Sequence, residues 1–319
     1  MSHHNDNSED DWSETQSVDS CEAYISFESI RDPCTRLEEA VSFSWPGIYQ
    51  HCEDGSTEEE EIQQQEDRKL RKITISTLLE EDDLAPLFGG CQWAGTRLWG
   101  AAVRAIQYLA GHLEMDESNN NNSGSSGAKF ELISSGDNKT TLLELGCGLG
   151  VPGMIYHLLG SNVVLTDQED ILTQLEKNVA DNFPSTVISN DETSSLDSAP
   201  AKQHYIRAMP LSWSRTGVNS LLEQLQLSTA GFDIVLNCDC VFEPLYGKSW
   251  HLLNETIDEL LKVNPKCVVV SSMERRGPAD GIDLFIDEMK EMEHVGSVEK
   301  VYYEEKRRIE IYVTRGLEE

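Results

Sequence analysis

The chain contains 319 residues, of which 25 are Lys or Arg and 57 are Asp or Glu, so its formal charge at pH 7 is −32. This imbalance argues against a nucleic-acid partner, because proteins that bind phosphate backbones carry clustered basic residues. No stretch approaches the roughly 20 apolar residues that a membrane-spanning helix needs, and the first residues lack the pattern of a signal peptide. We therefore expect no nucleic-acid or membrane partner, and a location in the cytoplasm and also the nucleus.

The charge is concentrated at the beginning of the chain. Residues 1–67 hold 19 acidic residues against two basic ones. Such a segment buries too little apolar surface to offset its chain entropy. We expect a largely disordered acidic region over residues 1–67 and one folded domain over residues 68–319. Polar, aperiodic stretches predict flexible insertions in that domain at about residues 116–128 and 184–202.

The eight cysteines are scattered, with no Cys-x-x-Cys and no His-x-x-x-His pair to complete a zinc site. We therefore expect free thiols and no metal. The nearest approach to a metal motif is Cys238-Asp239-Cys240. We expect these two sulfur atoms to point to opposite faces of the strand and therefore to lie too far apart to share an ion.

The spacing of apolar residues predicts the elements of the folded domain in chain order. A strand is expected at Ile73–Ser76 and a helix from Thr96 to Leu113. The elements expected after the first insertion are strand Thr141–Leu145, helix Val151–Leu159, strand Asn162–Thr166, helix Glu169–Asn182, strand His204–Arg207, strand Phe232–Asn237, helix Gly247–Val263, strand Cys267–Ser271, helix Gly281–Met292 and strands Val298–Tyr303 and Arg308–Thr314.

This alternation is typical of an α/β fold with a mostly parallel sheet covered by helices on both faces. The last two strands are too close in sequence for a crossover connection, so they are expected to pair as an antiparallel hairpin. The sequence thus predicts a Rossmann-like, doubly wound, seven-stranded sheet that ends in an antiparallel hairpin.

A glycine-rich turn, Glu144-Leu145-Gly146-Cys147-Gly148-Leu149-Gly150, follows the first strand of this series. Its glycines allow the backbone to approach a ligand, and its free amides point toward an anionic group. Asp167 ends the next strand, where its carboxylate can accept hydrogen bonds from both hydroxyls of a ribose. The succession of strand, glycine turn, helix, strand and acid predicts a nucleoside ligand.

Two nucleoside ligands are compatible with this turn. Gly148-Leu149-Gly150-Val151-Pro152-Gly153 is a G-x-G-x-x-G sequence, the dinucleotide fingerprint. NAD fits less well, because Glu144 would lie beside the pyrophosphate and repel it. The antiparallel hairpin also departs from the six-strand parallel pattern of dinucleotide-binding sheets. S-adenosylmethionine, which carries no phosphate, fits better.

The sequence resembles the seven-β-strand methyltransferases, and among them the methyltransferase-16 group of protein-lysine methyltransferases. The resemblance covers about residues 70–319. It rests, besides the glycine turn and Asp167, on Gly95-Thr96-Arg97-Leu98-Trp99-Gly100-Ala101-Ala102, on Leu211-Ser212-Trp213 and on Cys238-Asp239.

The resemblance implies a set of residues that bind S-adenosylmethionine. Asp167 is expected to hold the ribose, and Trp99 and Trp213 to line the cofactor pocket, although a buried indole is also a common core anchor. The other expected cofactor contacts are Glu144, Gly146, Cys147, Gly148 and Cys238.

The family also carries an Asp-x-x-Tyr signature near the substrate amine. Here it reads Asp239-Cys240-Val241-Phe242, with Phe in place of Tyr, so an aromatic wall is kept and its hydroxyl is lost. The resemblance implies that Asp239 accepts a hydrogen bond from the amine, and aromatic faces at Phe242 and Tyr246 suit a methylated ammonium. Glu243 or Tyr246 could supply the missing polar contact. The alternative for Asp239 is a helix N-cap.

The main hypothesis is an S-adenosylmethionine-dependent methyltransferase that acts, as a monomer, on a lysine side chain of a non-histone protein. The acidic region suits a substrate with a basic surface, but it is equally compatible with a solubilising role. One alternative is methylation of protein arginine or histidine or of a small metabolite. Another is an inactive binding module with the same fold, and an NAD oxidoreductase is a distant third.

Overall fold

The structure is a computed structural model that describes residues 24–30, 38–44, 71–76, 95, 98–109, 140–158, 160–184 and 204–317. The chain divides into two compact units, Met1–Leu78 and Leu79–Glu319. Except for Pro184, the insertions predicted at about residues 116–128 and 184–202 lie outside the described residues.

The first unit contains an antiparallel three-stranded sheet in the order β1-β2-β3, formed by β1 (Tyr24–Ile30), β2 (Glu38–Ser44) and β3 (Arg71–Ser76). The strand predicted at Ile73–Ser76 is confirmed as part of β3. Its partner β2 pairs with it in antiparallel register. The unit therefore extends past residue 67, where the sequence predicts the start of the folded domain.

Two strands, β1 and β2, lie within residues 1–67, for which the sequence predicts a largely disordered acidic region. Their backbone register places Ile25 opposite Phe43 and Phe27 opposite Val41. These short apolar alternations interrupt the acidic composition and suit paired strands. For the remaining residues of 1–67, which are not described, disorder stays a prediction.

The second unit follows the predicted alternation. Its described elements are α3 (Gly100–Leu109), β4 (Thr141–Leu145), α4 (Val151–Leu158), β5 (Asn162–Asp167), α5 (Glu169–Asn182), β6 (Ile206–Pro210), α6 (Arg215–Gln224), β7 (Ile234–Cys238), α7 (Glu243–Tyr246), α8 (Trp250–Val263), β8 (Val268–Glu274), α9 (Ile282–Lys290), β9 (Val295–Glu304) and β10 (Ile309–Gly316). The predicted strands and helices are present, with ends shifted by a few residues. The sequence did not predict α6, nor α7 as a separate turn of helix.

The seven strands form one sheet in the order β6-β5-β4-β7-β8-β10-β9. Neighbours from β6 to β8 are parallel, and β10 pairs antiparallel with both β8 and β9. The predicted fold class, including the closing hairpin, is confirmed. In this sheet β4 is the first strand in sequence. The next two strands, β5 and β6, lie on one side of it, and β7 and β8 lie on the other side. The reversal between β4 and β7 is the place where doubly wound sheets bind ligands.

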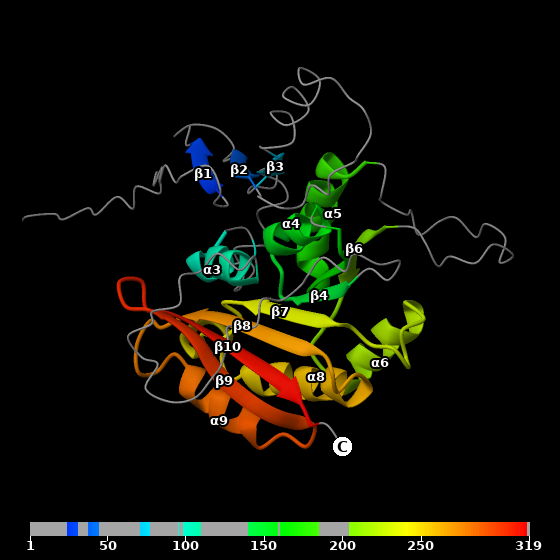
Figure 1. Cartoon of the computed structure of the whole chain (residues 1–319), viewed down its shortest axis with the longest axis vertical. Coiled ribbons are helices and arrows are strands. Elements are labelled where there is room, and N and C mark those ends of the chain that lie inside the picture. Colours follow the sequence, from blue (N-terminus) through cyan, green and yellow to red (C-terminus); the bar gives the residue numbers. More distant parts are fainter. Residues whose placement is uncertain are drawn as a thin grey trace, which may run out of the picture. The chain divides into compact units, whose positions relative to one another are not determined.

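Helices cover both faces of this sheet. Figure 1 shows α3, α4 and α5 on one face and α6, α8 and α9 on the other, in agreement with the contacts among these elements. Strands buried on two sides read as continuous apolar runs. Leu142, Leu143 and Leu145 of β4 are accordingly fully buried, as is Val163–Leu165 of β5. This burial fixes the central strands and hence the loops at their carboxyl ends.

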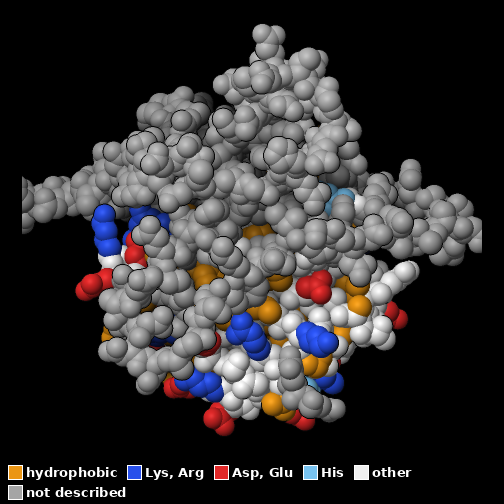
Figure 2. Space-filling model, in the orientation of Figure 1, with side chains coloured by type: hydrophobic (Ala, Val, Ile, Leu, Met, Phe, Trp, Pro, Cys, Tyr) orange, Lys and Arg blue, Asp and Glu red, His pale blue; other side chains and the backbone are white. Residues whose placement is uncertain are grey.

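The face of the molecule that Figure 2 shows carries charged side chains of both signs. On the face shown in Figure 2, Lys and Arg side chains are interspersed with Asp and Glu side chains among the described residues. In the part of the chain that the structure describes, no helix is both long enough and apolar enough to cross a membrane.

Candidate active site

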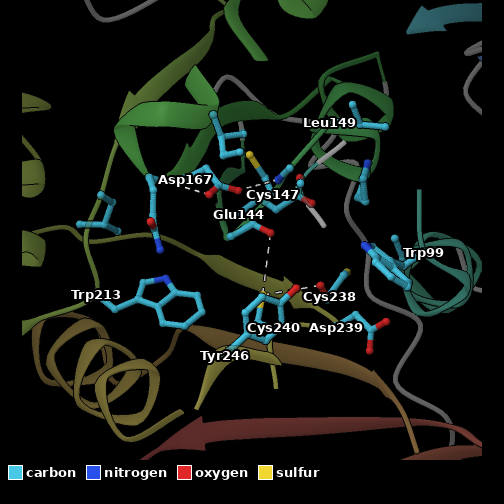
Figure 3. Close-up of a pocket in the computed structure, with 18 of the residues that line it drawn as sticks. Trp99, Glu144, Cys147, Leu149, Asp167, Trp213, Cys238, Asp239, Cys240 and Tyr246 are labelled. Atoms are coloured by element: carbon cyan, nitrogen blue, oxygen red, sulfur yellow. Dashed lines mark hydrogen bonds between the residues drawn. The ribbon is translucent and has the colours of Figure 1, made fainter. Parts of the chain in front are cut away.

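A cavity of about 280 Å³ lies at the carboxyl ends of the parallel strands, beside the reversal of strand order. Four loops contribute to it, those that follow β4, β5, β6 and β7. Its wall contains every residue that the sequence predicts to bind the cofactor, namely Trp99, Glu144, Gly146, Cys147, Gly148, Asp167, Trp213 and Cys238. Figure 3 shows Trp99 and Trp213 on opposite sides of the cavity. The topology therefore gathers residues that are far apart in sequence.

The glycine turn after β4 has a backbone that only glycine adopts readily. Gly146 has φ +59°, and a Cβ atom there would lie 2.8 Å from Cys240 Sγ and 3.2 Å from Trp213 Cζ2. Gly148 has φ +53°, and a Cβ there would lie 2.9 Å from the carbonyl oxygen of Gly95. The glycines thus satisfy both a left-handed conformation and a close approach of neighbouring groups.

Asp167 links this turn to β5. Its Oδ2 accepts a hydrogen bond from the Gly148 backbone N–H at 2.8 Å, and its Oδ1 accepts one from the Gln168 N–H at 2.7 Å. Burial raises the pKa of Asp167, and the two backbone hydrogen bonds partly oppose this effect. The carboxylate therefore lies at the strand end predicted for a ribose acceptor, with backbone donors that fix its orientation.

Glu144 is the deeper of the two acids and is 1% exposed. Its Oε2 accepts a hydrogen bond from the Gly153 N–H in the first turn of α4, at 2.8 Å. Burial raises the pKa of Glu144 to about 8, although the Gly153 hydrogen bond lowers it. Near pH 7 the side chain is therefore mostly protonated, and the repulsion that argued against a pyrophosphate weakens.

Each tryptophan stands next to a helix start. Trp99 directly precedes α3, and its carbonyl oxygen accepts a hydrogen bond from the Ala102 N–H at 3.0 Å. Trp213 lies between β6 and α6, where Ser214 caps the helix by accepting a hydrogen bond from the Gly217 N–H at 3.0 Å. Both indoles line the cavity, and Trp213 also packs against the hydrophobic core.

The segment after β7 corrects one expectation. The strand ends at Cys238, and Asp239 has φ +59°, so the alternation of a strand is broken there. Cys238 and Cys240 both line the cavity, so the expectation of opposite faces is wrong: successive residues of a strand alternate between faces, whereas residues two positions apart share one. Burial raises the pKa of both thiols, which keeps them neutral. Among the described residues, no group of three or more His, Cys, Asp or Glu side chains is arranged to hold a metal ion.

Asp239 lines the cavity, but its carboxylate is already engaged. Arg276 binds it through its two terminal nitrogens: Nη1 donates to Oδ1 at 3.0 Å, and Nη2 donates to Oδ2. Oδ1 also accepts a hydrogen bond from the Glu274 N–H at 3.2 Å. The alternative interpretation of Asp239 as a helix N-cap is wrong, because Phe242 occupies the N-cap position of α7.

The other three residues that are predicted near the substrate amine do not all lie at the cavity. Tyr246 lines the cavity, whereas Phe242 and Glu243 do not. The ring of Phe242 faces the guanidinium of Arg276, with 5.3 Å between Cζ and the ring centroid. Glu243 accepts a hydrogen bond from Trp250 Nε1 at 3.3 Å. Of the two residues considered as a substitute for the missing tyrosine hydroxyl, only Tyr246 is in place.

Several residues of the site carry no prediction from the sequence. Cavity-lining residues of this kind include Gln168, Ile171, Cys240, Ser249 and Leu252. Arg276, which binds Asp239, follows the carboxyl end of β8 by two residues. The rule that parallel strands present their carboxyl ends at one edge could have pointed to Arg276, since β8 pairs with β7.

The chain was compared with known proteins. The profile of the lysine methyltransferase family matches residues 89–292. A secreted RxLR effector protein 48 of Plasmopara viticola is 39% identical over 139 residues, which are 43% of this chain and 64% of that protein. The protein N-lysine methyltransferase METTL21A of Danio rerio is 28% identical over 172 residues, 54% of this chain and 64% of that protein. The chain thus spans somewhat less than two thirds of these relatives.

A solved structure of a TehB-like S-adenosylmethionine-dependent methyltransferase from Corynebacterium glutamicum is 13% identical, with a TM-score of 0.40. That likeness covers 74% of this chain and 97% of the other. Because the family profile extends over more than half of the sequence, the chain belongs to the lysine methyltransferase family, whose methyl donor is S-adenosylmethionine.

Proposed function

We propose that the protein is an S-adenosylmethionine-dependent N-methyltransferase that modifies a lysine side chain of a non-histone protein. The main observation in support is that one cavity is lined both by residues suited to a nucleoside and by residues suited to a substrate amine. Gly148 and Asp167 line the part of the cavity that we assign to the nucleoside, and Asp239 and Tyr246 line the part that we assign to the substrate amine. Family membership supports the same activity.

The cavity suits S-adenosylmethionine in size and in chemistry. Ligand pockets have volumes of roughly 300–1,000 Å³, and the volume of about 280 Å³ lies close to this range. Asp167 offers acceptor oxygens to ribose hydroxyls, and the two indoles offer flat apolar walls. Desolvation raises the pKa of the Cys147, Cys238 and Cys240 thiols, so they stay neutral and add no charge next to a sulfonium.

The cofactor, when bound, supplies an activated sulfonium methyl group. The residues of this chain have the simpler tasks of binding, alignment and water exclusion. Asp239 accepts a hydrogen bond from the target nitrogen and orients its lone pair, and Tyr246 also lines the cavity. An aromatic face also attracts a methylated ammonium through cation–π interaction.

The substrate and the working state are part of the proposal. We propose a protein substrate with a basic surface, supported by the formal charge of −32. The enzyme acts as a monomer, without nucleic-acid or membrane partners, in the cytoplasm and nucleus. The free state of Cys147, Cys238, Cys240 and Cys267 is in keeping with a reducing compartment. Fractionation of cells that express a tagged chain tests the location.

The activity is tested by incubating the purified chain with methyl-labelled S-adenosylmethionine and a cell extract, followed by hydrolysis of the labelled protein. We expect the label in methyl-lysine. Label in methyl-arginine, methyl-histidine or small molecules would contradict the proposal. Binding of S-adenosylhomocysteine without any transfer would instead indicate an inactive binding module.

Two variants make this experiment specific. Asp239→Asn should lower the turnover number at least about 100-fold, within the range expected for a misplaced general acid–base partner. S-adenosylhomocysteine should still bind with an affinity within about twofold of the wild type. The control is Asp283→Asn, which changes an acid that is 75% exposed and outside the cavity wall. Equal activity of both variants would remove Asp239 from the mechanism.

A further inference from the structure

Arg276 holds the carboxylate that is placed to receive the substrate amine. The guanidinium forms a two-pronged ion pair with Asp239, whose side chain is 2% exposed. Its Cζ atom lies 5.1 Å from the ring centroid of Trp99 and 5.3 Å from that of Phe242. Cation–π contacts of this length and a bidentate carboxylate pair fix the planar group in one orientation. Arg276 is itself absent from the cavity wall, so it supports Asp239 without entering the cavity.

This arrangement leaves Asp239 able to accept one more hydrogen bond. A carboxylate offers about four acceptor positions. Oδ1 receives the Glu274 N–H and Arg276 Nη1, whereas Oδ2 receives Arg276 Nη2. The remaining position on Oδ2 is available to a donor in the cavity, which Asp239 lines.

The charge of Asp239 presents a chemical problem that Arg276 solves. A lysine can accept a methyl group only as the neutral amine, because the ammonium has no lone pair. An isolated carboxylate next to the target nitrogen would favour the ammonium and raise its pKa. A guanidinium paired with that carboxylate offsets the negative charge and leaves the acceptor oxygen in place.

We propose that Arg276 is a positioning residue that neutralises Asp239, so that the target lysine is held at this carboxylate as a neutral amine. This inference rests on the proposed function. It assigns Arg276 to the reaction although the side chain touches neither the cavity nor, by this geometry, the reacting atoms. The role of Phe242 also becomes clear, because its ring packs on Arg276 rather than facing the amine.

Other titratable groups surround Asp239 and have to be considered. Glu274 on β8 contacts the outer side of Arg276 at 3.2 Å and is 32% exposed, so water screens its charge. Burial raises the pKa of the Cys238 and Cys240 thiols and keeps them neutral, and Glu144 of β4, whose pKa is about 8, stays unchanged in every variant compared below. Asp167 lies on the opposite, nucleoside-binding side of the cavity (Figure 3). Arg276 is thus the charge in direct contact with Asp239.

The test uses the full chain and the acceptor protein that the wild type labels in a cell extract, purified and supplied at saturating concentration. The turnover number is measured from pH 6.5 to 10, because it reports ionisations in the enzyme–substrate complex. The turnover number should rise with pH as the target lysine loses its proton, and this part of the profile is called the rising limb. Arg276→Gln should shift the midpoint of the limb to higher pH by about one unit or more, and it should lower the turnover number at pH 7.5 about tenfold. Arg276→Lys, which keeps the charge, should leave the position of the limb within about 0.3 units.

Two further variants separate charge from structure. Asp239→Asn combined with Arg276→Gln removes both charges, and the limb should return to its wild-type position even though the rate stays low. Arg275→Gln is the matched control, since that neighbouring arginine pairs with Glu310 and Asp283 outside the cavity. It should leave the profile unchanged. S-adenosylhomocysteine affinity and the melting temperature of each variant are recorded alongside.

The outcomes are distinct. If Arg276→Gln lowers the rate equally at every pH, or if Arg276→Lys shifts the limb as much as Arg276→Gln, the electrostatic role is wrong. If Arg276→Gln does not fold, the profiles of Arg276→Lys and of the double variant still decide the question. If the wild type forms no methyl-lysine, the proposed function itself fails, and the failure is independent of Arg276.

Discussion

The backbone N–H of Gly148 donates a 2.8 Å hydrogen bond to Oδ2 of Asp167, which joins the glycine turn after β4 to the end of β5. Asp167→Ala should therefore remove a ribose acceptor and also leave the Gly148 amide without this partner. We expect S-adenosylhomocysteine affinity to fall at least about tenfold, the cost of a hydrogen bond to a charged group. Isothermal titration calorimetry measures the change.

A matched control for this variant is Asp181→Asn on α5. Its carboxylate is 58% exposed and pairs with Lys177 on the same helix. Surface pairs of this kind contribute little. Loss of affinity in the control, or wild-type affinity in Asp167→Ala, would show that Asp167 does not hold the ribose.

Gly146→Ala should damage the cofactor site by sterics. The added Cβ would stand 2.8 Å from Cys240 Sγ, and the residue has φ +59°. We expect a loss of about 1–3 kcal/mol in the free energy of unfolding and a large loss of S-adenosylhomocysteine affinity. Gly160→Ala provides the comparison, because Gly160 also has positive φ, +107°, with no atom within 4 Å of an added Cβ. Equal affinities in the two variants would argue against a role for this close approach.

Much of the second unit follows from local pattern. The strand ending in Leu145, the helix Glu169–Asn182 and the closing hairpin are predicted because their apolar residues are periodic and continuous. The glycine turn and Asp167 are predicted because motif order encodes the topology, and topology brings strand ends together. The other cofactor residues are predicted from the resemblance to the methyltransferase family. These inferences need no knowledge of side-chain packing.

The remaining features depend on contacts between residues distant in sequence. The pairing of Asp239 with Arg276 joins residues 37 positions apart and is set by the alignment of β7 and β8. The left-handed backbone at Asp239 is unusual for a non-glycine residue and leaves no local sequence signal. Helix α6 is likewise not predicted from the sequence, because its first turn consists of Arg215, Thr216 and Gly217, which carry no apolar periodicity.

Ser214→Ala should destabilise α6 without changing the chemistry. Ser214 Oγ accepts a hydrogen bond from the Gly217 N–H at 3.0 Å, and the substitution leaves that amide uncapped. Loss of an N-cap costs about 1 kcal/mol. Chemical denaturation should show this loss, and Ser214→Asn, which keeps an acceptor oxygen, should recover most of it. A collapse of S-adenosylhomocysteine affinity would instead mean that α6 anchors Trp213 in the cavity.

Glu144 should make stability depend on pH. Its pKa in the folded chain is about 8, against 4.5 for an ordinary glutamate, because burial disfavours the charged form. Between these values the folded state holds a proton that the unfolded state has lost, so the free energy of unfolding should fall as pH rises from about 5 to 8. Replacement by Gln keeps an acceptor for the Gly153 N–H and removes the titration.

We therefore expect the difference in unfolding free energy between Glu144→Gln and the wild type to grow in favour of the variant from pH 5 to 8, by up to about 1.4 kcal/mol per pH unit. Denaturation curves at fixed ionic strength measure it. A bound cation favours the ionised form, so S-adenosylmethionine binding at pH 7 should release a proton from the wild type. Titrations in buffers of different ionisation enthalpy detect this release, and the variant should lack it. If the unfolding free energies of the wild type and Glu144→Gln changed equally with pH, and both proteins released the same number of protons on binding, Glu144 would be ionised in the folded protein.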